Sequence, residues 1–361
     1  AVRYYYTFLD TKEPLMHRLV PLLADFFQDI FPGFQEQKDF VKRVIEQEEI
    51  SFLRTLEGGI KRFETLKATN KVIAGKDAFE LYDTYGFPAD LTRLMAAEKG
   101  WSIDEAGFDK ALQEQKQRSR SDANIATGDW IEVNPTTSSP VFDGYDHDVL
   151  EGVKLIKYRS VEDRDGIHYQ LVLDRTSFYP EGGGQVGDRG TLSFGNEKIE
   201  VVDMIKENDL PIHLAMRLPA DVSASVTTSI DVKRRRLIED NHSATHLLHA
   251  ALRDVLGDHV QQRGSLLNEE YLRFDFSHFA KVTPEELQKI ETIVNQKIRE
   301  DIQLKEDRNI PISVAEKSGA RMLFGEKYGE KVRMITFDPA YSIELCGGCH
   351  VRSTGHIGFL K

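Results

Sequence analysis

Two short clusters of side chains in this sequence could bind a metal ion. The first is His242-Ser-Ala-Thr-His246, and the second, about a hundred residues later, is Cys346-Gly-Gly-Cys349-His350. Imidazole and thiolate are ligands that zinc prefers in proteins. His242, His246, one cysteine and His350 would together make a tetrahedral site with three nitrogens and one sulfur. The residues alone leave open which cysteine takes part.

The first cluster lies in a predicted helix from Ile238 to Leu256. A helix turns about 100° per residue, which places His242, His246 and His249 within roughly 60° of one another and opposite the apolar face. Histidines four residues apart on one face can bind one metal ion, whereas the alternative is a plain surface stripe. A metallopeptidase site is not predicted, because Ser243 stands where H-E-x-x-H needs glutamate.

The Cys-x-x-Cys-His pattern has two other known uses. One is covalent attachment of c-type haem, which usually belongs to exported proteins and would not account for the histidine helix. The other is a thioredoxin-like redox pair, which needs a strand-to-helix step. Gly347, Gly348 and the residues after His350 predict a loop instead. Zinc is therefore the preferred interpretation.

The elements that must position these residues fall into three regions, so the predicted fold class is α+β with several domains. Residues 1–120 predict a helical domain, since apolar residues recur at steps of three and four between positions 41 and 63. Residues 129–232 alternate β-rich runs with turns, which predicts a small antiparallel β-barrel or meander. Residues 233–361 mix helices and strands, which predicts a two-layer α/β domain. A linker is predicted over 121–128.

Composition limits the function classes. Charged residues make up 29% of the chain and the mean hydropathy is −0.41, so no membrane span is expected. Two cysteines in 361 residues make no disulfide framework, which predicts the reducing cytoplasm. A net charge of −12 argues against unselective nucleic-acid binding, but not against a shaped RNA held by local basic patches. Lys233-Arg-Arg-Arg236 is one such patch, or else a solvated helix start.

These motifs resemble the editing domain of alanyl-tRNA synthetases, to which the editing domain of the threonyl enzymes is related. The resemblance covers nearly the whole chain. Its segments are Asn241–Leu252, Gly264–Leu266, Leu272–His278, Leu323–Tyr328, Glu344–Gly348 and the glycine-rich Phe178–Asp188. Leu81–Pro88 is similar to the tRNA-recognition helical domain of the same family.

The resemblance implies a function for each region. Residues 1–120 would be a helical tRNA-recognition segment, residues 129–232 a glycine-rich β-barrel, and residues 233–361 an editing domain of the threonyl/alanyl-tRNA synthetase type. The ATP-dependent aminoacylation domain and the dimerising region of the family are expected to be absent from this chain. We therefore expect a fragment of a cytoplasmic enzyme whose partner is tRNA(Ala).

The resemblance also implies that His242, His246, Cys346 and His350 are the zinc ligands. Cys349 stands where the family usually has threonine, so it could compete with Cys346. Zinc could activate water or polarise the ester. Four protein ligands would leave no open position, so zinc could instead only position the substrate.

The implied reaction is hydrolysis of the ester in Ser-tRNA(Ala) or Gly-tRNA(Ala). The resemblance implies that Thr245 and Gln262 are the catalytic-site residues that recognise the seryl hydroxyl. A pocket that hydrogen-bonds a hydroxyl rejects the analogue without one by up to roughly 10⁴. The alternative function is a zinc-stabilised RNA-binding module without catalysis.

Two further sites are predicted to contact tRNA. Gly182, Gly183 and Gly184 begin a match to G-x-G-x-x-G, but the strand predicted after it excludes a dinucleotide site. These glycines either bring backbone amides close to the tRNA end or form a turn of the barrel. Asp83 either accepts hydrogen bonds from base amines in the acceptor stem or caps a turn.

Overall fold

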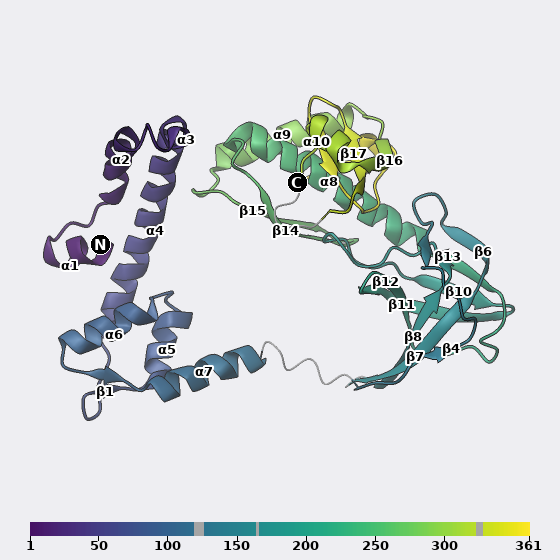
Figure 1. Cartoon of the computed structure of the whole chain (residues 1–361), viewed down its shortest axis with the longest axis horizontal. Helices are drawn as coiled ribbons and strands as arrows, with labels where there is room; N and C mark the ends of the chain where they lie inside the picture. The colour runs from purple at the N-terminus through teal and green to yellow at the C-terminus, as the bar shows by residue number, and fades with distance from the viewer. Residues whose placement is uncertain (119–125, 164–165, 323–327) are drawn as a thin grey trace. The chain divides into compact units, whose positions relative to one another are not determined.

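The computed structural model describes residues 1–118, 126–163, 166–322 and 328–361. The chain divides into two units, Ala1–Asn124 and Ile125–Lys361, which we treat separately (Figure 1). Most of the predicted linker and of the Leu323–Tyr328 segment lies outside the described residues, and the three domain boundaries stay predictions. None of the described helices has the length and apolar character that a membrane span requires.

The first unit is built around one long helix. Its elements are α1 (Val2–Phe8), η1 (Met16–Leu19), α2 (Val20–Phe26), α3 (Pro32–Glu36), α4 (Lys38–Glu64), β1 (Val72–Ile73), α5 (Gly75–Asp83), α6 (Ala89–Glu98), β2 (Ser102–Ile103) and α7 (Glu105–Arg118). The helix predicted from the apolar spacing is confirmed as α4, which buries Leu53, Leu56 and Phe63 on one face. Gly59 on the same face admits the ring of Phe87, because a Cβ there would lie 2.0 Å from it.

The second unit begins with a large antiparallel sheet. Its region contains β3 (Ala126–Thr127), β4 (Ile131–Glu132), β5 (Val141–Phe142), β6 (Val149–Val153), β7 (Leu155–Asp163), β8 (Gly166–Leu173), β9 (Arg175–Thr176), β10 (Gly190–Phe194), β11 (Glu197–Glu207), β12 (Leu210–Ala215) and β13 (Val226–Ile230). Nine of these strands form one sheet in the order β3-β7-β8-β12-β11-β10-β13-β6, with β4 beside β7. Among the described residues no pairing joins β3 to β6. The antiparallel sheet is therefore confirmed, and the closed barrel is not.

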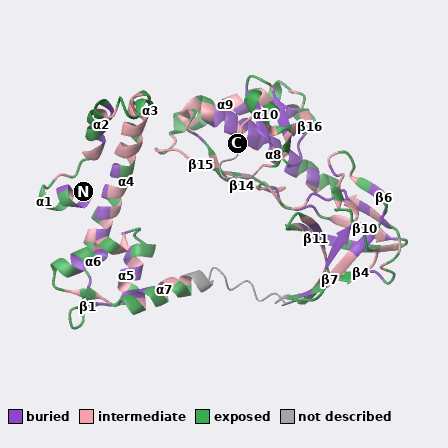
Figure 2. Ribbon diagram, viewed as in Figure 1, coloured by how far each residue is buried: buried purple, intermediate pink, exposed green. Residues whose placement is uncertain are grey.

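The rest of the second unit packs helices against the three-stranded sheet β16-β17-β18 and the hairpin β14-β15. Its elements are α8 (Val232–Leu256), β14 (Gln262–Leu267), β15 (Leu272–Phe276), α9 (Pro284–Arg299), β16 (Lys305–Pro311), α10 (Ile312–Lys317), β17 (Lys331–Phe337), β18 (Ser342–Leu345) and η2 (Thr354–Ile357). Buried residues run along α8, whose apolar side packs against α9 and β17 (Figure 2). At the start of α9, Thr283 and Glu286 form a capping box, in which each side chain accepts a hydrogen bond from the backbone N–H of the other residue.

A buried ion pair joins α8 to the sheet. Arg235, in the first turn of α8, is 1% exposed and pairs with Asp188, which precedes β10. Its guanidinium also donates to the carbonyl oxygens of Gly144 and Ser177, at 2.9 and 3.0 Å. Burying a charge is tolerable only when its donors are paired in this way. This one side chain therefore fixes α8 against three separate segments.

The basic run at the start of α8 is mostly occupied by internal contacts. Arg234 pairs with Glu269, Arg235 is buried, and Arg236 pairs with Asp148. Lys233 is exposed. The run is thus neither a fully solvated helix start nor a patch of four available cations, because three of its charges hold α8 in place.

Replacing Arg235 with methionine is expected to destabilise the second unit strongly. The change keeps a long side chain but leaves the Asp188 carboxylate buried without its cation, which costs about 3–5 kcal/mol. Arg273→Met is the matched control, because Arg273 pairs with Asp275 on the surface, where ion pairs contribute about 0–1 kcal/mol. Urea denaturation measures the free energy of unfolding of both variants. Equal losses would contradict the structural role given to Arg235.

Candidate metal centre

Helix α8 and the loop after β18 bring four potential ligands together. His242 and His246 lie one turn apart on α8, and Cys346 and His350 lie in the loop. One donor atom from each of these four residues lies within 4.8 Å of all the others. The Sγ atom of Cys346 is 3.3 Å from Nε2 of both His242 and His350. The structure thus assembles the four residues predicted as ligands.

The outer ring nitrogens of the histidines face polar groups. Nδ1 of His242 lies 2.8 Å from Oε1 of Gln185, and Nδ1 of His350 lies 3.2 Å from Oγ of Ser243. Nδ1 of His246 has no hydrogen-bond partner among the described residues but lies 3.7 Å from a carboxylate oxygen of Glu344. Such outer partners orient metal-binding histidines and select their tautomer. In His242 and His350 they leave Nε2 directed toward the sulfur.

The electrostatics of the cluster favour neutral imidazoles. The three histidines are at most 8% exposed, and burial lowers the pKa of His242 and His350 well below the usual value and that of His246 to a smaller extent. Burial alone would raise the pKa of Glu344, but His246, His249 and Arg321 hold it at about 2. Metal binding needs neutral imidazole, and a set of three nitrogens and one sulfur suits zinc. The residues present therefore fit the ion.

The surface-stripe alternative for the histidine helix is wrong. The helix wheel placed the histidines opposite the apolar face, and His242, His246 and His249 are only 3–5% exposed. Nδ1 of His249 lies 3.0 Å from Oε1 of Glu344. Both faces of α8 are covered, one by apolar residues and the other by the polar cluster.

Cys349 occupies a different environment from Cys346. Its side chain is 2% exposed, and burial raises the pKa of its thiol to about 12. Its backbone N–H donates to Oε1 of Gln185 at 2.8 Å. Cys349 is not one of the donors that cluster within the described part of the chain, and neither cysteine is in a disulfide. The geometry therefore groups Cys346, and not Cys349, with the histidines. The pentad follows a strand as a loop, as predicted, which does not suit a thioredoxin-like redox pair.

A pocket of about 540 Å³ opens beside the cluster and contains most of the other predicted site residues. Those that line it are His242, Thr245, His246, Gln262, Cys346, Gly182 and Gly183. The hydroxyl of Thr245 donates to the carbonyl of Asn241 at 2.9 Å, and Nε2 of Gln262 donates to Ser265 at 3.2 Å.

Gly184 lies close against Ser265, which lines the pocket. Its φ is +83°, and a Cβ there would lie 2.0 Å from Oγ of Ser265. The glycine-rich segment is a turn that pairs with the end of β14 at Leu267. A strand follows it rather than a helix, as predicted, because β10 begins at Gly190.

Asp83 lies in the other unit. It is exposed at the end of α5, where its carboxylate accepts a hydrogen bond from Gln115. A role in contacting tRNA stays a prediction.

Sequence reasoning missed several residues that shape the centre. Gln185 contacts His242 and Cys349, and Glu344 contacts His249. Arg333 and Tyr145 hydrogen-bond to the loop Cys346–His350, which we call the ligand loop. Two local signals were available, since Gln185 interrupts the glycine segment and Glu344 stands two residues before Cys346. The sequence carried no local signal for Arg333 or Tyr145.

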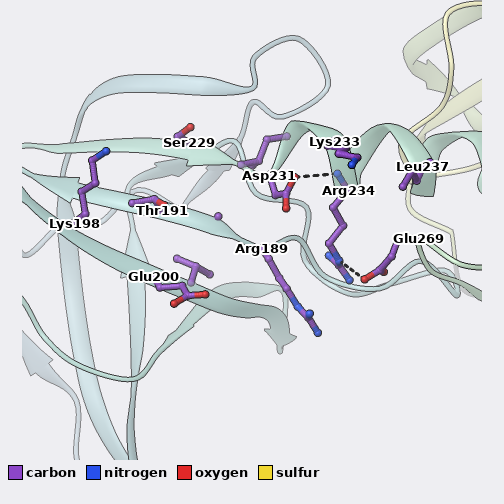
Figure 3. Close-up of a pocket in the computed structure, with 13 residues that line it drawn as sticks. Arg189, Thr191, Lys198, Glu200, Ser229, Asp231, Lys233, Arg234, Leu237 and Glu269 are labelled. Atoms are coloured by element: carbon purple, nitrogen blue, oxygen red, sulfur yellow. Dashed lines mark hydrogen bonds and ion pairs between the residues drawn. The ribbon is translucent and has the colours of Figure 1, made fainter.

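A second recess, of about 760 Å³, lies where α8 begins beside β10, β11 and β13 (Figure 3). Arg189, Lys198 and Lys233 are exposed there, and none of them forms an ion pair with a residue that the structure describes. Its acidic residues are Glu200, Asp231 and Glu269. Asp231 caps α8 and Glu269 pairs with Arg234. The three exposed cations are thus available to an anionic partner.

Comparison with known proteins connects this site to a family. A family model described as "tRNA synthetases class II (A)" matches residues 1–234, and one described as "Threonyl and Alanyl tRNA synthetase second additional domain" matches residues 332–361, which contain the ligand loop. "Alanine--tRNA ligase" of Cytophaga hutchinsonii is 56% identical over 366 residues, covering 100% of this chain and 42% of the relative.

Two further relatives carry the same name. Those of Parabacteroides distasonis and Flavobacterium psychrophilum are 51% and 48% identical, and the alignments cover 100% of this chain and 41% and 42% of the relatives. The chain thus spans about two fifths of the length of these relatives. Since the likeness runs through both units and includes the His/Cys cluster, the chain belongs to the alanyl-tRNA synthetase family.

Proposed function

We propose that this chain hydrolyses the ester bond of mischarged tRNA(Ala), releasing serine or glycine. The observation that carries the proposal is the pocket in which Thr245 and Gln262 lie beside His242, His246 and Cys346. The match of the ligand loop to the second additional domain of threonyl and alanyl-tRNA synthetases supports it.

His242, His246, Cys346 and His350 would hold zinc. When bound, the ion supplies a fixed positive charge beside the pocket. Since four protein ligands make a closed coordination shell, the recognition of the substrate falls to the neighbouring side chains.

Thr245 and Gln262 would recognise the seryl hydroxyl. The Thr245 hydroxyl already donates its proton to the carbonyl oxygen of Asn241, so its oxygen can only accept a hydrogen bond from the substrate. The amide nitrogen of Gln262 donates to Ser265, which leaves the amide oxygen as an acceptor. A seryl hydroxyl can donate to such a group, whereas the methyl group of alanine leaves it unpaired.

The recess at the start of α8 would contact the RNA backbone. Arg189, Lys198 and Lys233 are exposed there, and none of them forms an ion pair with a described residue. Arg189 follows the glycine-rich segment of the pocket by only a few residues, so the two surfaces share one stretch of chain. Cations without internal partners are the groups that bind phosphates and release counterions.

The deacylation assay tests the reaction. The chain is expected to hydrolyse Ser-tRNA(Ala) well above background and Ala-tRNA(Ala) much more slowly. Thr245→Val keeps the shape but removes the acceptor, so it is expected to reduce the preference for Ser-tRNA(Ala) by about tenfold or more, the cost of losing one hydrogen bond to the substrate.

Thr292→Val is the matched control for Thr245→Val. Thr292 makes the same hydrogen bond to the carbonyl four residues earlier, but on the exposed face of α9. It is expected to leave both rates unchanged. No hydrolysis of Ser-tRNA(Ala), with zinc and RNA still bound, would favour the alternative of a zinc-stabilised RNA-binding module.

The two cysteines are expected to differ in metal binding. Metal analysis of the purified chain is expected to find about one zinc ion per molecule. Cys346→Ala removes a clustered donor and is expected to lose most of the metal, whereas Cys349→Ala is expected to retain it. Equal losses, or a greater loss with Cys349→Ala, would contradict the proposed ligand set.

RNA binding is expected to depend on the three cations of the recess. In the variant Arg189→Ala/Lys198→Ala/Lys233→Ala, the slope of log affinity against log salt should fall in magnitude by about 2–3, since each lost phosphate contact removes about 0.7–0.9. The control Arg299→Ala/Lys289→Ala/Lys317→Ala removes the same charge from other exposed positions. Binding of tRNA(Ala) across a salt series measures both, and matching slopes would refute the assignment.

A further inference from the structure

Two side chains hold the backbone of the ligand loop from outside. The hydroxyl of Tyr145 donates to the carbonyl oxygen of Gly347 at 2.6 Å. Nη1 of Arg333 donates to the carbonyl oxygens of Cys346 and Gly348, at 2.9 and 2.6 Å. Three consecutive carbonyls thus accept hydrogen bonds from one residue near β5 and one on β17. We call Tyr145 and Arg333 the carbonyl clamp.

The clamp is itself held in place. The Arg333 guanidinium lies 4.0 Å from the centroid of the Tyr145 ring, and its Nε donates to the Glu306 carboxylate. The Arg333 side chain is only 11% exposed. Its backbone carbonyl also accepts from the N–H of Cys346 at 3.1 Å. Main chain and side chain of the same residue therefore both fix the position of Cys346.

The ligand loop needs such support because it cannot order itself. Gly347 and Gly348 have no side chains to pack, and glycine has the greatest backbone freedom. Gly348 cannot be replaced by a residue with a side chain, because a Cβ there would lie 1.9 Å from Cε1 of His242. The sulfur of Cys346 nevertheless has a defined position, 3.3 Å from the Gly348 N–H and from two histidine nitrogens.

We propose that Arg333 and Tyr145 are positioning residues of the metal centre, which hold the Cys346–Gly348 backbone so that the thiolate points at the histidines. The inference rests on the proposed zinc site, and it concerns metal affinity rather than the reaction. Partners in this position typically change metal affinity by about 10–100-fold.

Arg308 provides a matched control. It contacts the same Glu306 carboxylate and lies 5.0 Å from the centroid of the same Tyr145 ring. Arg308 also pairs with Asp146, and within the described part of the chain it makes none of the hydrogen bonds to the loop that Arg333 makes. Arg308→Met therefore removes the same type of charge from the same cluster without releasing the carbonyls.

The experiment compares zinc affinity by competition with a chromophoric chelator, using the whole chain. Arg333→Met is expected to weaken zinc binding about 10–100-fold, and Tyr145→Phe, which loses one neutral hydrogen bond, about fivefold. Arg333→Lys keeps the charge and should restore part of the loss. Arg308→Met should stay within about twofold of the parent chain, as expected for a partly exposed ion pair.

Cobalt substitution gives a second readout that a general loss of stability would not move. The thiolate-to-cobalt charge-transfer band is expected to weaken or shift in Arg333→Met and to be unchanged in Arg308→Met. Thermal unfolding of the metal-free variants establishes that both are folded. If Arg333→Met does not fold, the zinc affinities and cobalt spectra of Tyr145→Phe and Arg333→Lys are compared with those of Arg308→Met instead.

The outcomes separate this inference from the proposed function. Unchanged zinc affinity and cobalt spectrum in Arg333→Met, or an equal loss in Arg308→Met, would overturn the clamp while leaving the zinc site intact. If the parent chain itself binds no zinc, both the clamp and the metal centre are overturned. Loss of deacylation alone, with zinc affinity unchanged in every variant, would also overturn the clamp.

Discussion

The buried ion pair between Arg235 and Asp188 is the interaction on which the rest of the second unit depends. The buried pair is stable because the donors of the guanidinium also find other partners, the carbonyl oxygens of Gly144 and Ser177. These partners stand next to functional segments, because Gly144 precedes Tyr145 and Asp188 follows the glycine-rich turn. Two turns further along α8 comes His242. The direction in which α8 leaves this ion pair thus places His242 opposite Gln185.

Gln185 connects His242 to the ligand loop. Its Oε1 atom lies 2.8 Å from both Nδ1 of His242 and the backbone nitrogen of Cys349. One amide oxygen thereby joins the glycine-rich turn, α8 and the loop after β18. Glycines in the turn and in the loop let these backbones approach their neighbours closely. The clearest case is Gly348, where a Cβ would lie 1.9 Å from the ring of His242. The centre is consequently built from three segments that are each unable to form it alone.

Local features were predictable from the sequence, and long-range ones were not. The helices α4 and α8 and the capping box of α9 follow from apolar spacing and capping residues, which act within a few positions. Residue types and spacing predicted a site with His242, His246, His350 and one cysteine, and the family resemblance selected Cys346. The burial of the histidine face could not be predicted, because the residues that cover it, such as Glu344 and His350, are about a hundred positions away. For the same reason Arg235 resembled an ordinary surface cation, and no pattern in the sequence decides whether β3 meets β6.

The position of Glu344 has a consequence for the charge of the centre. Its carboxylate is ionised and lies against His246 and His249, inside the same buried region as the sulfur of Cys346. With a divalent ion bound, the thiolate and this carboxylate would set two negative charges against its two positive ones, while Arg321 lies 3.6 Å from the same carboxylate and Arg333 pairs with Glu306. Buried charges are tolerated when they are paired with opposite charges or coordinate a metal. Glu344 therefore supplies a negative charge that favours a dication in this buried cluster, without itself being one of the four clustered donors.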